Sequence, residues 1–336
     1  MLLNIFILAS VSTLSSASAY PCESFSNGSQ CDFVVKCNEF VEPHFEPTCH
    51  GYPNITIILS NAYEDNFQQS FFGKLKFKFT NHVQEIKVIN STLSFVYTGA
   101  FDYFHNCLRI DLSQNNIRAV TVSFGSLYKL NFLNLSCNHL ESIKEKLFND
   151  GYYNENMLQE LDLSNNKIID VGRNLNQLVN LRKLYLQNNR LMSIDGLEFW
   201  GLVHLTHLFM QHNLLITVPP FLALIHKLET LDLSSNNLTL IDFTDFFRCN
   251  ELEILLIDNN SIDTLLIDEN VQNLKKFKKL SLKGNPLVCK EIEPEFENST
   301  DIEKHIEVIT DEIFYVDKID RIKCESSSFA ISTTTK

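Results

Sequence analysis

Three aspartates are the residues whose type and spacing first suggest catalysis. Asp111, Asp162 and Asp232 each follow an apolar residue and precede Leu-Ser, so they hold the same place in a recurring phrase. Two neighbouring carboxylates can act as general acid and general base. Here each aspartate belongs to a different copy of the phrase, with other copies between them. This arrangement favours a structural or solubilising role over acid-base chemistry.

A group of histidines suggests a second kind of chemistry, metal binding. His207 and His212 can share one face, with His204 nearby, but no third ligand stands at a suitable spacing from that pair. The sequence also lacks a nucleophile elbow, a phosphate-binding glycine loop, a paired Cys-x-x-Cys motif and a zinc-protease helix. We therefore predict no catalytic residues, no metal, no cofactor and no enzymatic activity.

The recurring phrase belongs to an internal repeat that must position all these residues. The pattern L-x-x-L-x-L-x-x-N-x-L appears as LQELDLSNNKI, LRKLYLQNNRL and LETLDLSSNNL, and looser copies extend it to about nine. Successive copies start 23 to 28 residues apart, and the longest spacing contains an insertion at residues 151–155. The copies begin at Val83, Cys107, Leu130, Leu158, Leu181, Leu205, Leu228, Leu252 and Phe277.

Each copy predicts one short strand followed by a turn and a return segment. Leucines at the fourth and sixth positions point inward, and one copy cannot bury them alone, so the copies must stack into a parallel sheet. Asparagines at the ninth position then form a ladder that satisfies backbone groups: Asn138, Asn166, Asn189, Asn213 and Asn236. Apolar residues that fill the convex side are Ile143, Val171, Ile194, Val218, Ile241, Phe124, Phe199, Phe221 and Phe246.

These copies resemble the extracellular class of leucine-rich repeat proteins. The resemblance implies an α/β fold, a curved horseshoe-shaped solenoid with a parallel concave sheet and disulfide-bonded caps at both ends. The phrase NSTL at residues 90–93 and the Phe-, Asn- and Lys-rich wording are similar to insect Toll ectodomains and mosquito leucine-rich immune proteins. Residues 285–289 look like the start of a C-terminal cap of this class, closed most simply by a disulfide between Cys289 and Cys324.

The N-terminal cysteines and the chain ends predict a secreted product. We expect a signal peptide at residues 1–19, an N-terminal cap with a degenerate first turn at 20–82, repeats at 83–288, a C-terminal cap at 289–325 and a Ser/Thr-rich tail at 326–336. Four cysteines in the N-terminal cap predict two disulfides, with three connectivities open: Cys22, Cys31, Cys37 and Cys49. Seven glycosylation sequons agree with secretion: Asn27, Asn54, Asn90, Asn134, Asn237, Asn259 and Asn298.

Three further cysteines lie within the repeats. Cys107 and Cys249 fall where small core residues pack. Cys137 stands at the exposed eighth position, so either it stays a shielded thiol or it links the chain covalently to a partner or a second copy. The net charge of −13 predicts no nucleic-acid partner, and no apolar run beyond the signal region is long enough to span a membrane.

Repeat phase predicts which side chains line the concave face. The third and fifth positions flank the buried leucines, and in four consecutive copies they combine aromatic, aliphatic and charged residues that are typical of a contact patch. These predicted ligand-binding residues are Lys183, Tyr185, His207, Phe209, Thr230, Asp232, Ile254 and Leu256. A glycan on Asn134 would direct contact toward the same copies or toward the convex side.

Apolar residues that step by three and four predict an amphipathic helix over residues 302–322, which would cover the last repeat.

The function that follows from the resemblance is binding of an extracellular protein or microbial surface ligand, with a role in innate immunity. The alternative is a matrix or adhesion component resembling small leucine-rich proteoglycans. Release into body fluid after infection would favour the first, and retention in matrix the second.

Overall fold

The computed structural model describes most of the repeat region and short parts of both caps. The described residues are 22–26, 32–37, 54–60, 80–286, 307–309, 314–316 and 322–324, with gaps inside the long range at 97–99, 122–123, 125–126, 144–146, 149–156, 195, 197–198 and 267–273. The predicted signal peptide, insertion and Ser/Thr-rich tail lie outside these residues. So do Asn27, Asn298, Cys31, Cys49 and Cys289.

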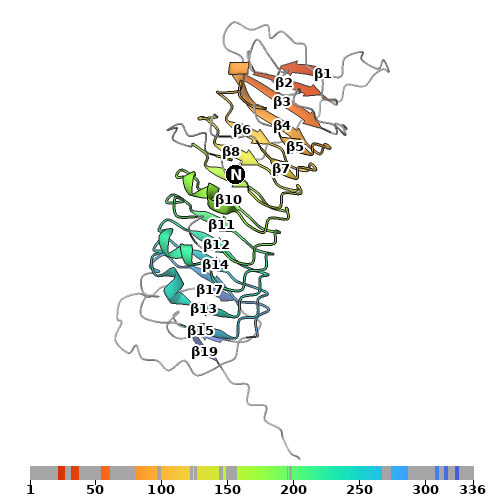
Figure 1. Ribbon diagram of the computed structural model, residues 1–336. Coiled ribbons are helices and arrows are strands. Elements are labelled where there is room, and N and C mark those ends of the chain that lie inside the picture. The colour runs from red at the N-terminus through yellow and green to blue at the C-terminus, as the bar shows by residue number, and fades with distance from the viewer. Residues whose placement is uncertain are drawn as a thin grey trace, which may run out of the picture.

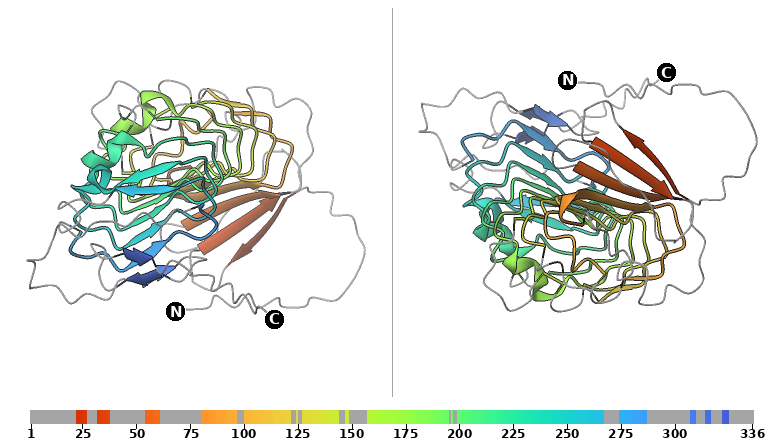
Figure 2. Two further views of the ribbon diagram at one scale, coloured as in Figure 1. Left: turned by 90° about the horizontal axis from the view of Figure 1, so that it is seen from below. Right: turned by 90° about the horizontal axis from the view of Figure 1, so that it is seen from above.

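A single long sheet runs through the described part of the chain. Its thirteen strands have the order β1-β2-β3-β4-β6-β8-β9-β10-β11-β12-β14-β16-β17. The strands follow one another from β1 at one end of the sheet to β17 near the other (Figure 1). The successive turns overlie one another when the solenoid is viewed end-on (Figure 2). The described chain is therefore a parallel-sheet solenoid, as the repeat pattern predicts.

The nine repeat copies each supply one strand of this sheet. These strands are β4 (Val83–Ile89), β6 (Arg109–Asp111), β8 (Phe132–Asn134), β9 (Glu160–Asp162), β10 (Lys183–Tyr185), β11 (His207–Phe209), β12 (Thr230–Asp232), β14 (Ile254–Leu256) and β16 (Lys279–Ser281). Neighbours pair in parallel with equivalent positions opposite each other, as in Leu161 with Leu184. The prediction that the fourth position is buried between two more exposed neighbours is confirmed.

The interior consists of one continuous apolar core and a ladder of buried asparagines. The convex-side residues predicted from the repeat are at most 7% exposed, and Phe199 stacks on Phe221 with ring centroids 4.0 Å apart. Asn138 shows the ladder's geometry. Its Nδ2 donates to the carbonyl oxygens of Leu112, Leu135 and Ser136, and its Oδ1 accepts from the Ile117 N–H. Each asparagine thus ties its own turn to the preceding one.

Both ends of the sheet extend beyond the repeat copies. At the N-terminal end, β1 (Cys22–Ser26) pairs antiparallel with β2 (Asp32–Cys37), β2 pairs parallel with β3 (Asn54–Ser60), and β3 pairs with β4. Cys22 and Cys37 are register partners in this hairpin. At the other end β17 (Glu307–Ile309) adds parallel to β16. The two predicted disulfide-bonded caps remain predictions.

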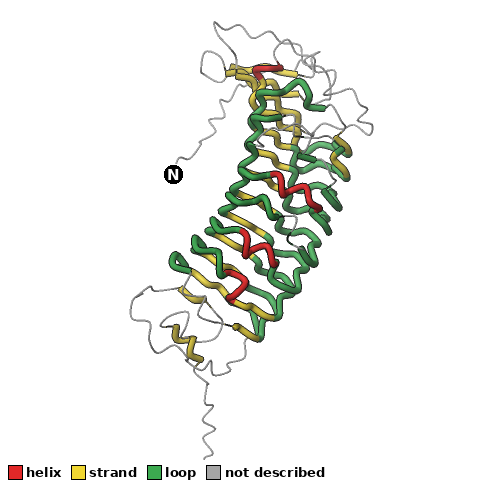
Figure 3. Tube along the Cα trace, turned by 60° about the vertical axis from the view of Figure 1, so that its left-hand side comes forward, coloured by secondary structure: helices red, strands yellow, loops and turns green. Residues whose placement is uncertain are grey.

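Small sheets and short helices complete the turns. Two parallel pairs are β5 (Phe95–Val96) with β7 (Ala119–Val120), and β13 (Leu240–Asp242) with β15 (Thr264–Leu266). The helices in the described residues are all 3-10 helices: η1 (Thr80–His82), η2 (Gly172–Gln177), η3 (Pro220–Leu224) and η4 (Phe243–Phe246). Three of them follow one another along one side of the solenoid (Figure 3). The helical contribution to the expected α/β fold is therefore small.

Two expectations need correction. The amphipathic helix predicted over residues 302–322 is wrong, because this segment contains β17 and β18 (Phe314–Val316), and β18 pairs antiparallel with β19 (Ile322–Cys324). The segment is rich in β-branched Ile and Val, which favour strands, and short apolar spacing does not separate the two structures. The expected count of about nine repeats also needs adjustment, because nine copies each supply a strand but only about seven turns of the solenoid are complete. The first copy carries Ser91 in place of a ladder asparagine, and the last described copy ends the ladder at Asn285.

Candidate functional site

The eight predicted ligand-binding residues lie together on four consecutive strands of the long sheet, β10, β11, β12 and β14. Lys183 pairs in register with His207, His207 with Thr230, and Thr230 with Ile254. The fifth-position residues align in the same way in a second row: Tyr185, Phe209, Asp232 and Leu256. All eight are half-buried on one face of the sheet, and we call this set the concave patch. Its role in binding remains a prediction.

A stacked aromatic pair forms the centre of the concave patch. The rings of Tyr185 and Phe209 have centroids 5.1 Å apart and planes only 8° from parallel. His207 lies against the same pair, with its ring centroid 6.4 Å from that of Phe209, and its Nδ1 is 2.8 Å from the Thr206 Oγ1. Neighbouring strands place aromatic side chains at stacking distance, and such pairs contribute about 0.5–1.5 kcal/mol beyond their buried area.

Acidic neighbours border this aromatic pair on its N-terminal side. The pKa of the Tyr185 hydroxyl is raised, first because the ring is partly buried and then because the Glu160 and Asp162 carboxylates disfavour a second negative charge. The phenol therefore stays neutral at physiological pH and keeps its proton for hydrogen bonding. Beside the pair, Gln187 and Gln211 bury their Oε1 atoms without a hydrogen-bond partner among the described residues.

The three aspartates considered for catalysis serve the backbone turns. Asp111, Asp162 and Asp232 each accept a hydrogen bond from the N–H two residues later, at 3.0, 2.9 and 2.9 Å. They stand on β6, β9 and β12, and further strands separate each pair. Burial raises the pKa of the Asp162 and Asp232 carboxyls, although the Ser164 and Ser234 groups that donate to them act in the opposite direction. Their geometry is that of turn-stabilising side chains.

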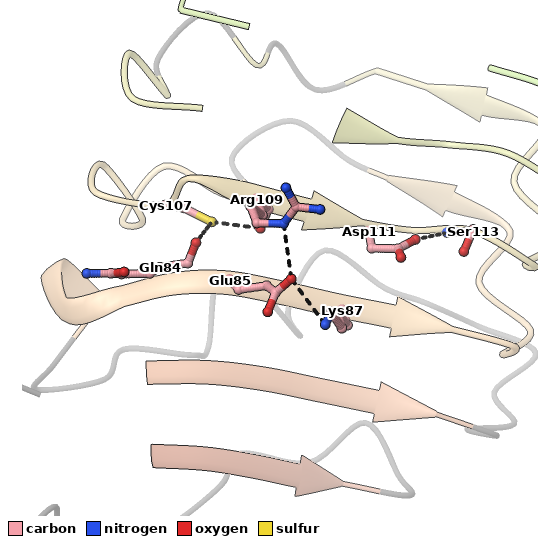
Figure 4. Close-up of polar contacts among 7 residues, drawn as sticks. All are labelled: Gln84, Glu85, Lys87, Cys107, Arg109, Asp111 and Ser113. Carbon is pink, nitrogen blue, oxygen red and sulfur yellow. Dashed lines mark hydrogen bonds and ion pairs between the residues drawn. The ribbon is translucent and has the colours of Figure 1, made fainter. Parts of the chain in front are cut away.

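The N-terminal part of the same face is charged, and this cluster was not predicted from the sequence. Glu85 bridges Lys87 at 3.1 Å and Arg109 at 3.4 Å, and the Arg109 guanidinium lies 3.8 Å from the ring centroid of Phe132. The ion pairs and the Asp111–Ser113 bond are visible in Figure 4. These residues hold the third and fifth positions of the earlier copies, so aligning all nine copies would have revealed the cluster. Its charges already have partners within the chain.

The histidines do not form a metal site in the described part of the chain. No group of three or more His, Cys, Asp or Glu side chains there is arranged to hold an ion. His204 instead places its Nδ1 2.9 Å from the Lys227 Nζ, while His207 belongs to the aromatic cluster.

The cysteines within the repeats divide as the repeat phase predicts. Cys107 and Cys249 are buried in the core, and burial raises the pKa of both thiols to about 12. Cys137 is exposed and has a left-handed backbone with φ of 54°. The equivalent position of eight other turns, one residue before the ninth position of the repeat, is left-handed as well, at Asn90, Gln114, Asn165, Asn188, His212, Ser235, Asn259 and Gly284.

The described sequons differ in exposure. Asn54, Asn90, Asn237 and Asn259 are exposed, whereas Asn134 is half-buried on β8 and its Oδ1 accepts the Ser136 N–H at 2.9 Å. Asn134 pairs in register with Asp111 on one side and Asp162 on the other. It therefore lies on the same face as the concave patch, two strands before Tyr185.

Comparison with known proteins agrees with this architecture. Residues 156–215 and 227–249 match family models described as leucine-rich repeats. Chicken lumican is 32% identical over 199 residues, which cover 52% of this chain and 57% of lumican. Human leucine-rich repeat-containing protein 66 is 31% identical over 145 residues, or 39% of this chain and 16% of that protein. The chain thus spans little more than half of lumican and a small share of the human protein.

Solved structures show the same fold. The Drosophila Toll–Spatzle complex matches with a TM-score of 0.53 and 20% identity, over 70% of this chain and 38% of that chain. Residues 156–215 and 227–249 therefore match leucine-rich repeats, and the solenoid has a fold similar to that of a Toll ectodomain. Among the described residues, no helix is long and apolar enough to cross a bilayer.

Proposed function

We propose that this chain is a secreted, non-enzymatic recognition protein that binds an extracellular protein or microbial surface ligand through its concave patch, with innate immunity as its setting. The observation that carries the proposal is the stacked Tyr185–Phe209 pair, with Asp232 in register beside Phe209 and the register partners Lys183 and His207 two residues earlier on the same strands. Aromatic side chains supply contact area with few rotatable bonds, and charged neighbours orient a partner. The likeness to Toll supports this use of the fold.

The difference between the two ends of the sheet supports the concave patch as the binding site. Toward the N-terminus, Glu85, Lys87 and Arg109 are engaged with each other, so a ligand there would have to displace existing ion pairs. A glycan on Asn134 would also cover the strands around β8. On β14, by contrast, Ile254 and Leu256 offer aliphatic side chains that gain from burial.

A matrix or adhesion role of the small leucine-rich proteoglycan type is the second candidate. The 32% identity with chicken lumican favours it. Secretion of the protein into body fluid after infection, rather than constant retention in the matrix, would support recognition over this alternative.

The test is affinity capture from the native extracellular fluid with the intact chain and with the double variant Tyr185→Ala/Phe209→Ala. We expect the double variant to retain less than about a tenth of the partner, since hot-spot aromatic side chains each contribute about 2 kcal/mol or more. Tyr128→Ala is the matched control, because Tyr128 is exposed and stacks on His105 away from the concave patch. Equal capture by all three proteins would place the binding site elsewhere.

The exposed Cys137 adds a covalent possibility to the same proposal. In an oxidising extracellular compartment, its thiol and that of a partner or second copy would lose two hydrogens to the local oxidant and form one disulfide. Capture with and without reductant would then recover different species from the intact chain. A Cys137→Ala variant should give the reduced pattern under both conditions.

A further inference from the structure

A second exposed surface lies beyond the ends of the strands, on the edge of the solenoid. In three consecutive turns, the tenth and twelfth positions are exposed or half-buried, and the eleventh position between them is completely buried. The buried residues are Ile168, Leu191 and Leu215. The six outward residues are Lys167, Ile169, Arg190, Met192, Leu214 and Ile216. We call this set the edge patch.

Backbone hydrogen bonds show that the three turns of the edge patch lie side by side. The Arg190 N–H donates to the Ile168 carbonyl at 2.9 Å, and the Leu214 N–H donates to the Leu191 carbonyl at 2.8 Å. Each turn is thus bonded directly to the next at this edge, at about the 5 Å spacing of neighbouring strands. The six side chains therefore form two adjacent rows of three.

The edge patch is unusually apolar for an exposed surface. Ile169, Met192 and Ile216 are 61%, 62% and 58% exposed, and Leu214 is 37% exposed. Isolated exposed apolar residues need no explanation, but contiguous ones mark interaction surfaces. By comparison, the aromatic residues of the concave patch are half-buried.

The two cations of the edge patch have no acidic partner. Every ion pair in the described part of the chain lies elsewhere, and none involves Lys167 or Arg190. In a chain with net charge −13, the six residues of the edge patch carry two cations and no acid, and the nearest acid in the same row is Glu141 of the preceding turn, whose carbonyl accepts the Ile169 N–H at 3.0 Å. The charge of the edge patch is complementary to an acidic partner that the rest of the surface would repel.

One sequon borders the edge patch at its C-terminal end. Asn237 follows Leu214 in the same row, because its N–H donates to the Leu215 carbonyl at 2.8 Å. It borders the patch without belonging to it, and no patch residue is itself a sequon.

We propose that the edge patch is a second binding surface, which docks an acidic protein segment with interleaved apolar side chains. Four of its six residues are apolar, so a purely polyanionic sugar would leave most of the surface unused. A second copy of this chain fits less well, since a two-fold contact centred on the middle turn would bring Arg190 against Arg190. The partner's acids pair with Lys167 and Arg190, and its apolar side chains cover Ile169, Met192 and Ile216.

Fluorescence anisotropy of the full chain with three synthetic ten-residue peptides tests this proposal. The peptides alternate Glu with Leu, Glu with Ser, and Lys with Leu. We expect the Glu-Leu peptide to bind at least tenfold more tightly than either of the others. Equal binding of the Glu-Ser peptide would overturn the proposal in favour of simple polyanion binding.

Matched variants locate the binding. Arg190→Glu and the pair Ile169→Ser/Ile216→Ser should each weaken Glu-Leu binding at least tenfold. The controls are Lys275→Glu and Val179→Ser/Val203→Ser, which change exposed residues at the opposite end of the strands and should bind like the unmodified chain. Equal affinities for patch and control variants would also overturn the proposal.

Two further measurements distinguish the edge patch from the concave patch and from a dimer contact. Tyr185→Ala/Phe209→Ala should leave Glu-Leu binding intact, so failure of the concave patch and failure of the edge patch give different results. Light scattering should show the same mass for the unmodified chain and Arg190→Glu. A dimer that Arg190→Glu converts to monomer would replace the acidic partner with a second copy.

Discussion

The buried asparagine ladder and the concave patch are separated by only a few residues in each turn, yet they obey opposite rules. Ladder positions keep one residue type, because each amide completes hydrogen bonds to two turns in a space that excludes water. Concave positions range from Lys183 to Phe209 to Asp232 across neighbouring strands, because sheet pairing uses only the backbone. The repeat thus requires the same residue type at each ladder position and tolerates different residue types on the concave face.

The largest expected effect comes from breaking the ladder with Asn189→Ala. Asn189 donates to the carbonyl oxygens of Leu163 and Leu186 at 3.0 Å and accepts from the Ile168 N–H at 3.0 Å. Each buried group left unpaired costs about 1–3 kcal/mol, so the free energy of unfolding should fall by about 3 kcal/mol or more. Urea titration measures this. Asn116→Ala, at an exposed asparagine, is the control and should cost less than about 0.5 kcal/mol.

A smaller effect should follow from dismantling the aromatic pair of the concave patch. A double-mutant cycle on Tyr185→Ala and Phe209→Ala should give a coupling free energy of about 1 kcal/mol, as expected for stacked rings. The overall fold should persist, because both side chains lie outside the core. A loss comparable to that of Asn189→Ala would show that the face shares the structural role of the interior.

A substitution at Cys137, in the turn between the concave face and the ladder residue Asn138, should stabilise the protein. Cys137 adopts φ of 54°, a left-handed conformation that costs most L-residues about 1 kcal/mol and that asparagine tolerates better. Cys137→Asn should therefore raise the free energy of unfolding by about 0.5–1 kcal/mol. Cys137→Ala keeps the strain and serves as the control. Equal stabilisation by both variants would point to the thiol, rather than the backbone, as the source.

The smallest expected effect is a pH-dependent change in stability at Asp232. Burial raises the pKa of the Asp232 carboxyl above its unfolded value, so its contribution to stability is complete below the unfolded pKa and is lost as pH rises through the folded pKa. Asp232→Asn keeps the acceptor for the Ser234 N–H, as Asn134 does for Ser136. The variant should be the more stable protein at neutral pH and lose that advantage toward pH 3. Thermal melts across this range measure the difference, and a constant offset would contradict the assignment.

The interior could be predicted from the sequence because its signals recur in every copy. Leucines, ladder asparagines and convex phenylalanines each have one role, and nine repetitions outweigh local exceptions. The Glu85–Arg109–Phe132 cluster was missed, since it joins residues 23 or more positions apart that no single copy contains. The left-handed turn was missed too, although Asn or Gly at five of its nine positions is a usable signal. The C-terminal strands β17, β18 and β19 were not predicted, because they lie beyond the last repeat copy, and a short apolar pattern alone fits a helix as well as a strand.

The hydrogen bond from the Ser136 N–H to Asn134 has a consequence for the timing of biosynthesis. The side-chain Oδ1 of the sequon asparagine is engaged in the turn, and Ser136, the third sequon residue, is only 8% exposed. A glycosylating enzyme that must contact both residues can reach them only before the third repeat has closed. The fraction of chains with a glycan at Asn134 would therefore depend on whether sugar transfer is faster than the docking of one turn onto the next. Slowing that docking by a ladder variant would raise the glycosylated fraction.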